Sequence, residues 1–288
     1  MAPPPVSEDP VVSDEEESSQ MTKTASTPQH FVLVHGIGHG AWCWYKIRCL
    51  LEKSGYKVSC IDLKSAGIDP SDPDTIFTLE EYNKPLIDFL STLPENEKII
   101  LVGHSAGGVS VTHAVHTYGK KIHLAIYVAA TMLRFGFLTD QDLLDGAPQL
   151  SEFGDVYDFG FGLGLQQAPT SVIIKKKFQH KIIYQMSPLE DSALASMLLK
   201  PGPLRALQSA RFVVEEEDVD QVQRVYIKTM NDHVIKPNQQ DAMINKWPPS
   251  DIFVLESDHS PFFSVPSELF GLLVKATATA TSKKIFSA

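Results

Sequence analysis

The chain has 288 residues, 43% of them hydrophobic, which is enough apolar material for one large α/β domain or two small domains. Its formal net charge of −10 disfavours nucleic acid as a partner and attraction to a membrane surface, because both demand a basic face. No apolar run approaches the roughly 20 residues that cross a bilayer, so we expect a globular protein without a membrane partner.

The N-terminal segment differs in composition from the rest of the chain. It is rich in acidic residues, prolines and serines and lacks apolar periodicity, so we predict a disordered acidic tail over residues 1–28. The segment has no apolar stretch of the secretory kind, and its acidity differs from that of an organelle transit peptide. We therefore expect the protein to be cytoplasmic.

Strand-like and helix-like segments alternate from His30 onward. In chain order, we predict a strand over 31–34, a helix over 44–51, a strand over 58–63, a helix over 79–90, a strand over 98–102, a helix over 107–118, and strands over 122–129, 224–229 and 252–255. This alternation predicts an α/β fold, with a mostly parallel sheet and helices on both faces. Residues 29–130 and 213–277 would form this core, and residues 278–288 a flexible C-terminal tail.

The alternation breaks between residues 131 and 212. This stretch has scattered aromatic and methionine residues and no clear run of strands, so we predict a helical cap inserted into the core. The insertion follows a sheet strand and would lie over the carboxyl ends of the strands, where ligands bind in open α/β folds. The alternative interpretation is a helical part of the core with no role toward a substrate.

The most informative motif is Gly-His-Ser-Ala-Gly at residues 103–107, between an apolar strand and a helix. This order of strand, G-x-S-x-G and helix is typical of the nucleophile elbow of serine hydrolases. Glycines lack a Cβ atom, so the chain can turn sharply and present the hydroxyl of Ser105 outward. Ser105 is therefore the candidate nucleophile, with an ordinary turn serine as the alternative.

A serine hydroxyl needs a histidine base and a carboxylate that orients the base. In this kind of fold, the chain order is serine, acid, histidine, with the acid and the base on loops after late strands. Asp232 follows the strand over 224–229, and His259 follows the strand over 252–255. We predict Asp232 as the acid and His259 as the base, with Asp258 and Asp241 as rival acids.

The same chemistry needs two backbone N–H donors for the developing oxyanion. One is expected from Ala106, directly after the nucleophile, and the other from the loop after the first strand. That loop, residues 35–40, reads His-Gly-Ile-Gly-His-Gly, and Ile37 is the predicted second donor. The alternative is that these glycines only make a turn.

The cysteines suggest no metal site. Cys43, Cys49 and Cys60 lack the paired spacing of metal ligands and lie among apolar residues, so we expect reduced thiols. Serine-based hydrolysis needs no metal and no cofactor, and we expect neither.

Several long motifs lie between about His30 and Ala276. They are Phe-Val-Leu-Val-His-Gly at 31–36, Gly-Ala-Trp-Cys-Trp-Tyr-Lys at 40–46, Ile-Asp-Leu-Lys-Ser-Ala-Gly at 61–67, Ile-Leu-Val-Gly-His-Ser-Ala-Gly-Gly at 100–108, Tyr-Gln-Met-Ser-Pro at 184–188, Arg-Val-Tyr-Ile-Lys at 224–228 and Asp-His-Ser-Pro-Phe-Phe at 258–263. With these motifs the chain resembles one family, the plant methylesterase branch of the α/β-hydrolases. This branch is related to salicylate-binding esterases and to the hydroxynitrile lyases of the same fold.

The resemblance implies an α/β-hydrolase fold and esterase activity. Residues 258–261 are most similar to members that cleave methyl indole-3-acetate and other small aryl or heterocyclic methyl esters. Salicylate-type esterases usually carry methionine where this chain has Ser260, which argues against methyl salicylate as the main substrate. The lyases carry threonine at Gly36 and lysine at Ser260, so the groups that hold the cyanohydrin hydroxyl and stabilise cyanide are absent.

The sequence therefore predicts a serine carboxylesterase that hydrolyses methyl esters of small aromatic or heterocyclic acids, with a methyl indole-3-acetate-like hormone ester as the small-molecule partner. Two alternatives stay open: an esterase acting on a larger methyl ester, whose acid product can lose CO₂ spontaneously, and a non-catalytic ligand receptor on the same fold. The oligomeric state is open, with a homodimer as one option. The expected substrate-binding residues are Gly36, Gly38, His104, Met132, Phe159, Phe161, Met186 and Ser260.

Overall fold

A parallel sheet forms the centre of the protein. The computed structural model describes Met1, residues 29–212 and residues 217–286. Within these residues, a six-stranded sheet has the order β2-β1-β3-β4-β7-β8, and every neighbouring pair is parallel. The predicted α/β fold is confirmed. Its strands are β1 (His30–Val34), β2 (Lys57–Ile61), β3 (Ile99–His104), β4 (Ile122–Val128), β7 (Arg224–Thr229) and β8 (Asp251–Leu255).

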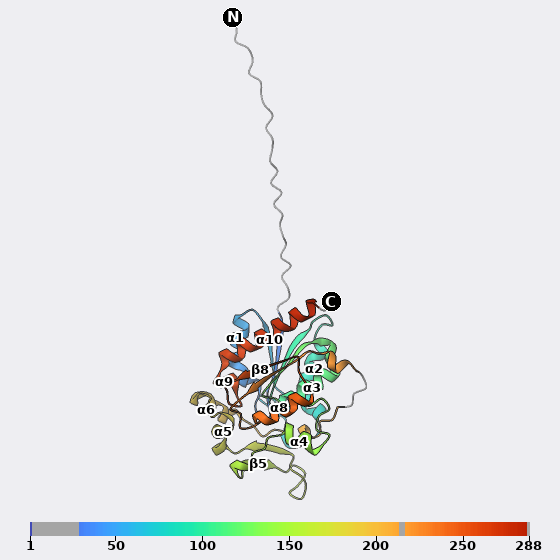
Figure 1. Cartoon of the computed structure of the whole chain (residues 1–288). Helices are drawn as coiled ribbons and strands as arrows, with labels where there is room; N and C mark the ends of the chain where they lie inside the picture. The colour runs from blue at the N-terminus through green and yellow to red at the C-terminus, as the bar shows by residue number, and fades with distance from the viewer. Residues whose placement is uncertain (2–28, 213–216, 287–288) are drawn as a thin grey trace.

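Helices cover both faces of this sheet (Figure 1), with α1 and α10 packed together on one face and α2 and α3 on the other. A capping box between Thr78 and Glu81 starts α2, because each side chain satisfies a backbone N–H of the first turn. Short 3₁₀ turns join several of the elements. The helices of the core are α1 (Tyr45–Lys53), α2 (Leu79–Thr92), α3 (Gly107–Tyr118), α8 (Pro237–Lys246), α9 (Pro261–Ser264) and α10 (Pro266–Phe286).

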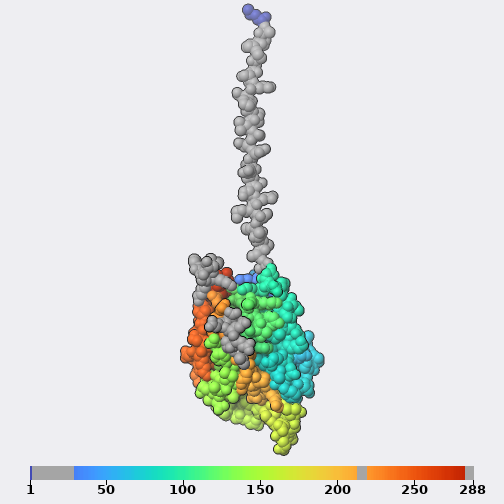
Figure 2. Space-filling model, turned by 90° about the vertical axis from the view of Figure 1, so that its right-hand side faces the viewer, coloured from blue at the N-terminus to red at the C-terminus, as the bar shows by residue number. Residues whose placement is uncertain are grey.

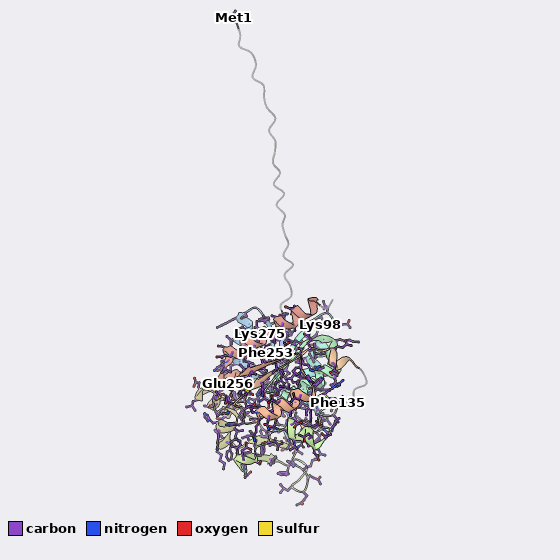
Figure 3. The ribbon with its side chains drawn as sticks, viewed as in Figure 1. Met1, Lys98, Phe135, Phe253, Glu256 and Lys275 are labelled. Atoms are coloured by element: carbon purple, nitrogen blue, oxygen red, sulfur yellow. The ribbon has the colours of Figure 1, made fainter. Side chains whose placement is uncertain are left out.

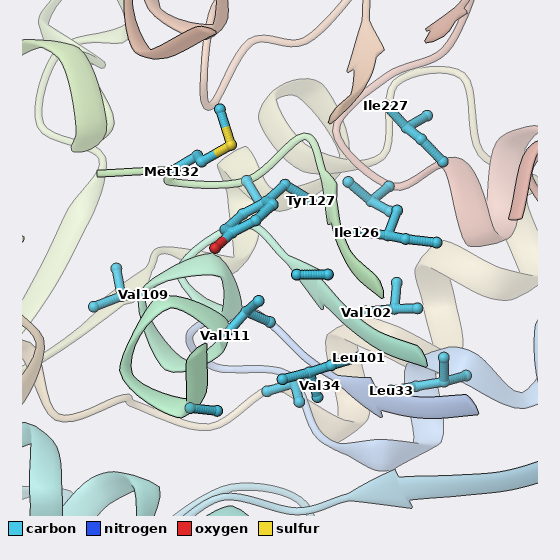
Figure 4. Packing of buried hydrophobic residues seen from close by; sticks show 14 of the residues in the cluster. Leu33, Val34, Leu101, Val102, Val109, Val111, Ile126, Tyr127, Met132 and Ile227 are labelled. Atoms are coloured by element: carbon cyan, nitrogen blue, oxygen red, sulfur yellow. The ribbon is translucent and has the colours of Figure 1, made fainter. Parts of the chain in front are cut away.

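The core lies between the sheet and its helices. Figure 4 shows Val111 of α3 beside Leu101 and Val34 of the strands, and all three side chains are fully buried. The helix comes this close because Gly103 has no side chain, and a Cβ there would lie 2.5 Å from the Val111 Cγ2 atom. Burying one such aliphatic side chain contributes about 1.5–3 kcal/mol relative to leaving it exposed.

The strands run so that their carboxyl ends point toward the cap. Lys98, one residue before β3, lies at the end of the molecule far from the cap, and Glu256, one residue after β8, lies nearer to it (Figure 3). Loops that follow parallel strands therefore gather under the cap, as in other open α/β sheets. This arrangement brings residues that are distant in sequence to one place.

The cap, residues 131–212, forms one end of the molecule, as the yellow part of Figure 2 shows. The predicted helical cap does contain helices, and it also holds an antiparallel pair that was not predicted, β5 (Tyr157–Gly160) and β6 (Ser171–Ile174). Strands of four residues are too short to give a recognisable alternation in the sequence. The helices of the cap are α4 (Asp140–Gly146), α5 (Lys176–Ile183), α6 (Leu189–Leu198) and α7 (Leu204–Gln208).

The C-terminal segment also differs from its prediction. Helix α10 continues to Phe286, so the expected flexible tail over 278–288 is wrong for residues 278–286. Ala276 and Ala280 are buried against the core, and this burial holds the helix through a threonine-rich stretch of low helix propensity. The predicted acidic tail over 1–28 lies outside the described residues, apart from Met1. Among the helices that the structure describes, none has the length and apolar character to span a bilayer.

Candidate active site

Ser105 occupies a strained turn between β3 and α3. Its φ angle is +53°, a left-handed conformation that a residue with a side chain adopts only when the surrounding structure enforces it. The Ser105 carbonyl accepts hydrogen bonds from the Gly108 and Thr131 N–H groups, both at 3.0 Å. A Cβ on Gly107 would lie 2.4 Å from the His35 carbonyl oxygen, so only glycine fits the close approach at the start of the helix. These are the features of a nucleophile elbow.

The loops after β7 and β8 bring Asp232 and His259 together. The His259 Nδ1 atom lies 2.8 Å from the Asp232 Oδ2 atom, and both side chains are buried. The other Asp232 oxygen accepts the N–H groups of Val234 at 2.7 Å and Ile235 at 2.9 Å. Thr229 donates its hydroxyl to Oδ2 at 3.0 Å. The carboxylate is thus held in place and binds Nδ1, which leaves the His259 Nε2 atom as the nitrogen able to accept a proton.

The two rival acids have other partners. Asp241 forms an ion pair with Lys228 at 2.5 Å on the protein surface. Asp258 directs both oxygens away from the His259 ring, to backbone and hydroxyl donors of Met186, Ser187, Ser260 and Ser264. Asp232 is therefore the carboxylate that contacts the candidate base.

Ile37 and Ala106 lie in the wall of the same cavity as Ser105 and His259. Within the described part of the chain, neither the Ile37 N–H nor the Ala106 N–H donates a hydrogen bond to another residue. Unpaired N–H groups at partly buried positions are rare in native structures, and they stay available here for a ligand oxygen. The loop approaches the elbow closely, because a Cβ on Gly36 would lie 2.7 Å from the Ser105 Cβ atom.

Three buried histidines surround the candidate site. Burial lowers the pKa of His35 and of His104 and lowers the pKa of His39 to about 3, so all three are neutral near pH 7. His104 donates from Nε2 to the carbonyl oxygen of His259 at 2.7 Å, and its ring centroid lies 4.6 Å from that of His259. His35 accepts the Leu63 N–H at 3.1 Å. These histidines support backbone around the site and contribute no positive charge to it.

The cavity beside Ser105 has a volume of about 310 Å³. Core residues and cap residues share its wall, so the cap does cover the carboxyl ends of the strands. The wall is mostly aliphatic and aromatic. The contribution of the cap includes Tyr157, Phe159, Val172, Ile174, Leu199 and Leu207.

The cavity wall carries little charge. Lys200 is the one lysine or arginine among its described residues, and its Nζ atom donates to the Asp69 carbonyl oxygen at 3.0 Å. Arg134, at the start of the cap, forms an ion pair with Asp220 at 2.5 Å and is not part of the wall. The cavity therefore offers a neutral ligand an apolar surface and offers a carboxylate no free cation.

Two of the eight predicted substrate-binding residues, Gly38 and Phe159, lie in the cavity wall. The other six residues lie outside the cavity wall, so their prediction as substrate-binding residues is corrected. Gly36 packs on Ser105, and His104, Met132 and Ser260 are buried behind the wall. The other two side chains are exposed on the cap. The corrected residues are Gly36, His104, Met132, Phe161, Met186 and Ser260.

Tyr157 was not among the predicted substrate-binding residues, and its ring centroid lies 5.5 Å from that of Phe159. Alternate residues of a strand share a face, so Tyr157 and Phe159 of β5 both face the cavity. Phe161 lies beyond the end of β5 and does not follow this alternation. Recognising the short strand would have identified Tyr157. The wall residues of β6 and α7 carry no comparable signal in the sequence.

A strained serine after a parallel strand, a buried histidine–aspartate pair and two free N–H donors, all beside one cavity, define an α/β-hydrolase of the serine type. Comparison with known proteins agrees. The family described as "Alpha/beta hydrolase family" matches residues 31–272. Methylesterase 17 of Arabidopsis thaliana is 53% identical over 275 residues, which cover 94% of this chain and 100% of that protein.

Two further relatives point the same way. Pheophorbidase of Raphanus sativus is 45% identical and covers 86% of this chain and 94% of its own length. The crystal structure of the methylesterase MES16 from Arabidopsis has a TM-score of 0.79 at 42% identity, and covers 87% of this chain and 99% of its own. The chain belongs to the plant methylesterase family of the α/β-hydrolases, and it is an esterase. This confirms the predicted family and enzyme class.

Proposed function

We propose that this esterase hydrolyses methyl esters of small aromatic or heterocyclic carboxylic acids, with methyl indole-3-acetate as the leading candidate. The observation that carries the proposal is the apolar cavity of about 310 Å³ with Ser105 and His259 in its wall. Small-molecule sites span about 300–1,000 Å³, so this volume lies at the lower end of the range. An apolar wall with aromatic rings suits a flat, neutral ester of that size.

The reaction follows from the roles that we assign to the residues of the site. His259 Nε2 takes the proton of the Ser105 hydroxyl while the Ser105 oxygen attacks the ester carbonyl. The carbonyl oxygen becomes negative and accepts hydrogen bonds from the Ile37 and Ala106 N–H groups. Each such donor lowers the activation barrier by about 3 kcal/mol. Asp232 accepts a hydrogen bond from the His259 Nδ1–H group, stays ionised, and stabilises the imidazolium.

The second half of the reaction reverses these proton transfers. The imidazolium of His259 protonates the departing methoxide, and methanol leaves an acyl group on Ser105. Water, deprotonated by His259, then attacks the acyl carbonyl, and the Ser105 oxygen recovers its proton as the acid is released. The product is a carboxylate, which water solvates better than an apolar wall with no free cation does. This difference favours product release.

The free N–H groups of Ile37 and Ala106 support turnover over simple ligand binding. An unpaired donor beside the nucleophile costs stability, and it has a use when charge develops on a substrate oxygen. A methyl ester much larger than about 310 Å³ would require the cavity to change shape. Both considerations favour a small-ester hydrolase over a receptor and over an esterase for bulky substrates.

The test is a panel of methyl esters of indole-3-acetate, jasmonate, salicylate and a bulky alkaloid acid. We expect the highest kcat/KM and steady multiple turnover with methyl indole-3-acetate. Ser105→Ala should remove turnover and leave the melting temperature nearly unchanged. Preference for the bulky ester would favour the larger substrate class, and full activity of Ser105→Ala would remove the proposed mechanism.

A further inference from the structure

One segment of the cap contacts all three loops of the candidate active site. We call residues 184–187 the cap anchor. The segment directly follows α5, and its sequence is Tyr-Gln-Met-Ser. It meets the loop over 35–40, the loop after β7 and the loop after β8 through separate hydrogen bonds.

The first contact holds the loop that carries the candidate oxyanion donor Ile37. The Tyr184 hydroxyl and the His39 Nε2 atom share a hydrogen bond of 2.7 Å, and both side chains are buried. The His39 ring is also stacked on Trp42, with 5.4 Å between ring centroids. His39 follows Ile37 by two residues in the same loop, so this contact lies close to the candidate oxyanion donor.

The second contact holds the loop of His259. Asp258 is fully buried, and its Oδ2 atom accepts the Met186 N–H at 2.9 Å and the Ser187 hydroxyl at 2.8 Å. Its Oδ1 atom accepts the Ser260 N–H at 2.9 Å. Asp258 therefore links the cap anchor to Ser260, the residue that follows His259.

The third contact reaches the loop of Asp232. The Gln185 Nε2 atom donates to the carbonyl oxygen of Asn231 at 2.5 Å, one residue before the acid. Each of these hydrogen bonds to the loops thus falls within two residues of Ile37, Asp232 or His259.

We propose that the cap anchor positions the catalytic loops, so that the seated cap sets the distances among nucleophile, base and oxyanion donors. The inference rests on the function proposed above for Ser105 and His259. Residues 184–187 are positioning residues, because they reach the reacting atoms only through the loops. A displacement of about 1 Å in such a site costs roughly a hundredfold in rate, so small losses of support are measurable.

The structure supplies a matched control. The Tyr45 hydroxyl of α1 donates to the buried Asp191 of α6 at 2.7 Å, so it also joins the core to the cap. This contact involves none of the three loops, and Asp191 keeps a second partner in Lys46. Tyr45→Phe and Tyr184→Phe therefore remove the same group from two cap contacts that differ in their relation to the active site.

The experiment measures kcat and KM of these variants and of Ser187→Ala with methyl indole-3-acetate and with p-nitrophenyl acetate, together with melting temperatures. We expect Tyr184→Phe and Ser187→Ala to lower kcat by tenfold to a hundredfold with KM changed less than threefold. Tyr45→Phe should keep kcat within twofold. The rate of covalent labelling by a small fluorophosphonate should fall in the same two variants and not in Tyr45→Phe.

The opposite pattern would overturn the inference. If Tyr184→Phe and Ser187→Ala melt lower but keep their kcat and labelling rate, the cap anchor only stabilises the fold. If Tyr184→Phe does not fold, Gln185→Ala tests the same inference from a half-buried position. Hydrolysis of p-nitrophenyl acetate without hydrolysis of any methyl ester would reject the proposed function alone, because the cap anchor can still be tested with that probe.

Discussion

At the scale of single residues, the space around Ser105 is the tightest constraint in the site. A Cβ at Gly36 would lie 2.7 Å from the Ser105 Cβ and 3.1 Å from the His104 Nδ1 atom. We therefore expect Gly36→Ala to lower kcat at least tenfold by displacing the nucleophile or the Ile37 N–H. Gly271→Ala is the matched control, since a Cβ there meets no other atom within 4 Å. Equal activity of both variants would show that the loop can yield without harm.

Tyr157 is the residue whose hydroxyl we expect to select among aromatic esters. It lies in the cavity wall, and burial raises its pKa to about 12, so it is a neutral phenol at pH 7. Within the described residues, its hydroxyl has no hydrogen-bond partner. A hydrogen bond to the indole N–H would be worth about 1 kcal/mol, roughly a fivefold effect. Tyr157→Phe should lower kcat/KM about fivefold for methyl indole-3-acetate and leave kcat/KM for methyl naphthalene-1-acetate unchanged. An equal loss of kcat/KM for both esters would show that the hydroxyl only contributes to packing.

At the scale of elements, the sequence predicted what depends on strong local patterns. The strand predicted over 98–102, the turn at Ser105 and the helix after it combine apolar runs, paired glycines and helical spacing. The structure has all three, with the strand at Ile99–His104. The pair β5–β6 has only four residues in each strand, so no pattern could develop. The cavity wall could not be predicted for a different reason: its residues come from separate elements, and their contacts exist only in the folded chain.

The C-terminal end of helix α10 should contribute to the stability of the fold. Because Ala280 is buried and Thr281 lies 3.4 Å from the His123 ring, residues 278–286 contribute to stability. Removing residues 278–288 should lower the free energy of unfolding by roughly 1 kcal/mol, because the buried methyl group of Ala280 is lost from the core. Urea denaturation measures this change. Activity should not change, because α10 packs on α1 and β8, away from the cavity. An unaltered urea midpoint would mean that the end of the helix adds nothing.

In the molecule as a whole, the site depends on the parallel direction of the sheet strands, which the sequence predicted. Ser105, Asp232 and His259 follow β3, β7 and β8, and parallel strands place their carboxyl ends at one edge. Alternation of strands and helices therefore predicted that these residues meet, although they lie far apart in the chain. The cap anchor could not be predicted, because nothing in residues 184–187 indicates which loops they reach.

The same compactness makes the protein sensitive to acid. His39 and His104 are fully buried, and burial lowers the pKa of His39 from 6.5 to about 3 and that of His104 well below 6.5. Below pH 6.5 the unfolded chain binds protons at these residues and the folded protein does not, so the free energy of unfolding falls as the pH falls. For His39, this loss continues down to about pH 3.

Linkage gives the size of the effect. Between pH 6.5 and 5.5, His39 should remove roughly 1 kcal/mol of stability, and His104 acts in the same direction. Urea denaturation at pH 7.5, 6.5 and 5.5 measures the change, and this range lies above the usual pKa values of carboxylates. His104→Gln keeps an N–H donor for the His259 carbonyl and cannot be protonated, so it should reduce the loss, while His35 and the other histidines of lowered pKa still contribute. A free energy of unfolding that stays constant from pH 7.5 to 5.5 would mean that these histidines are protonated in the folded protein as readily as in the unfolded chain.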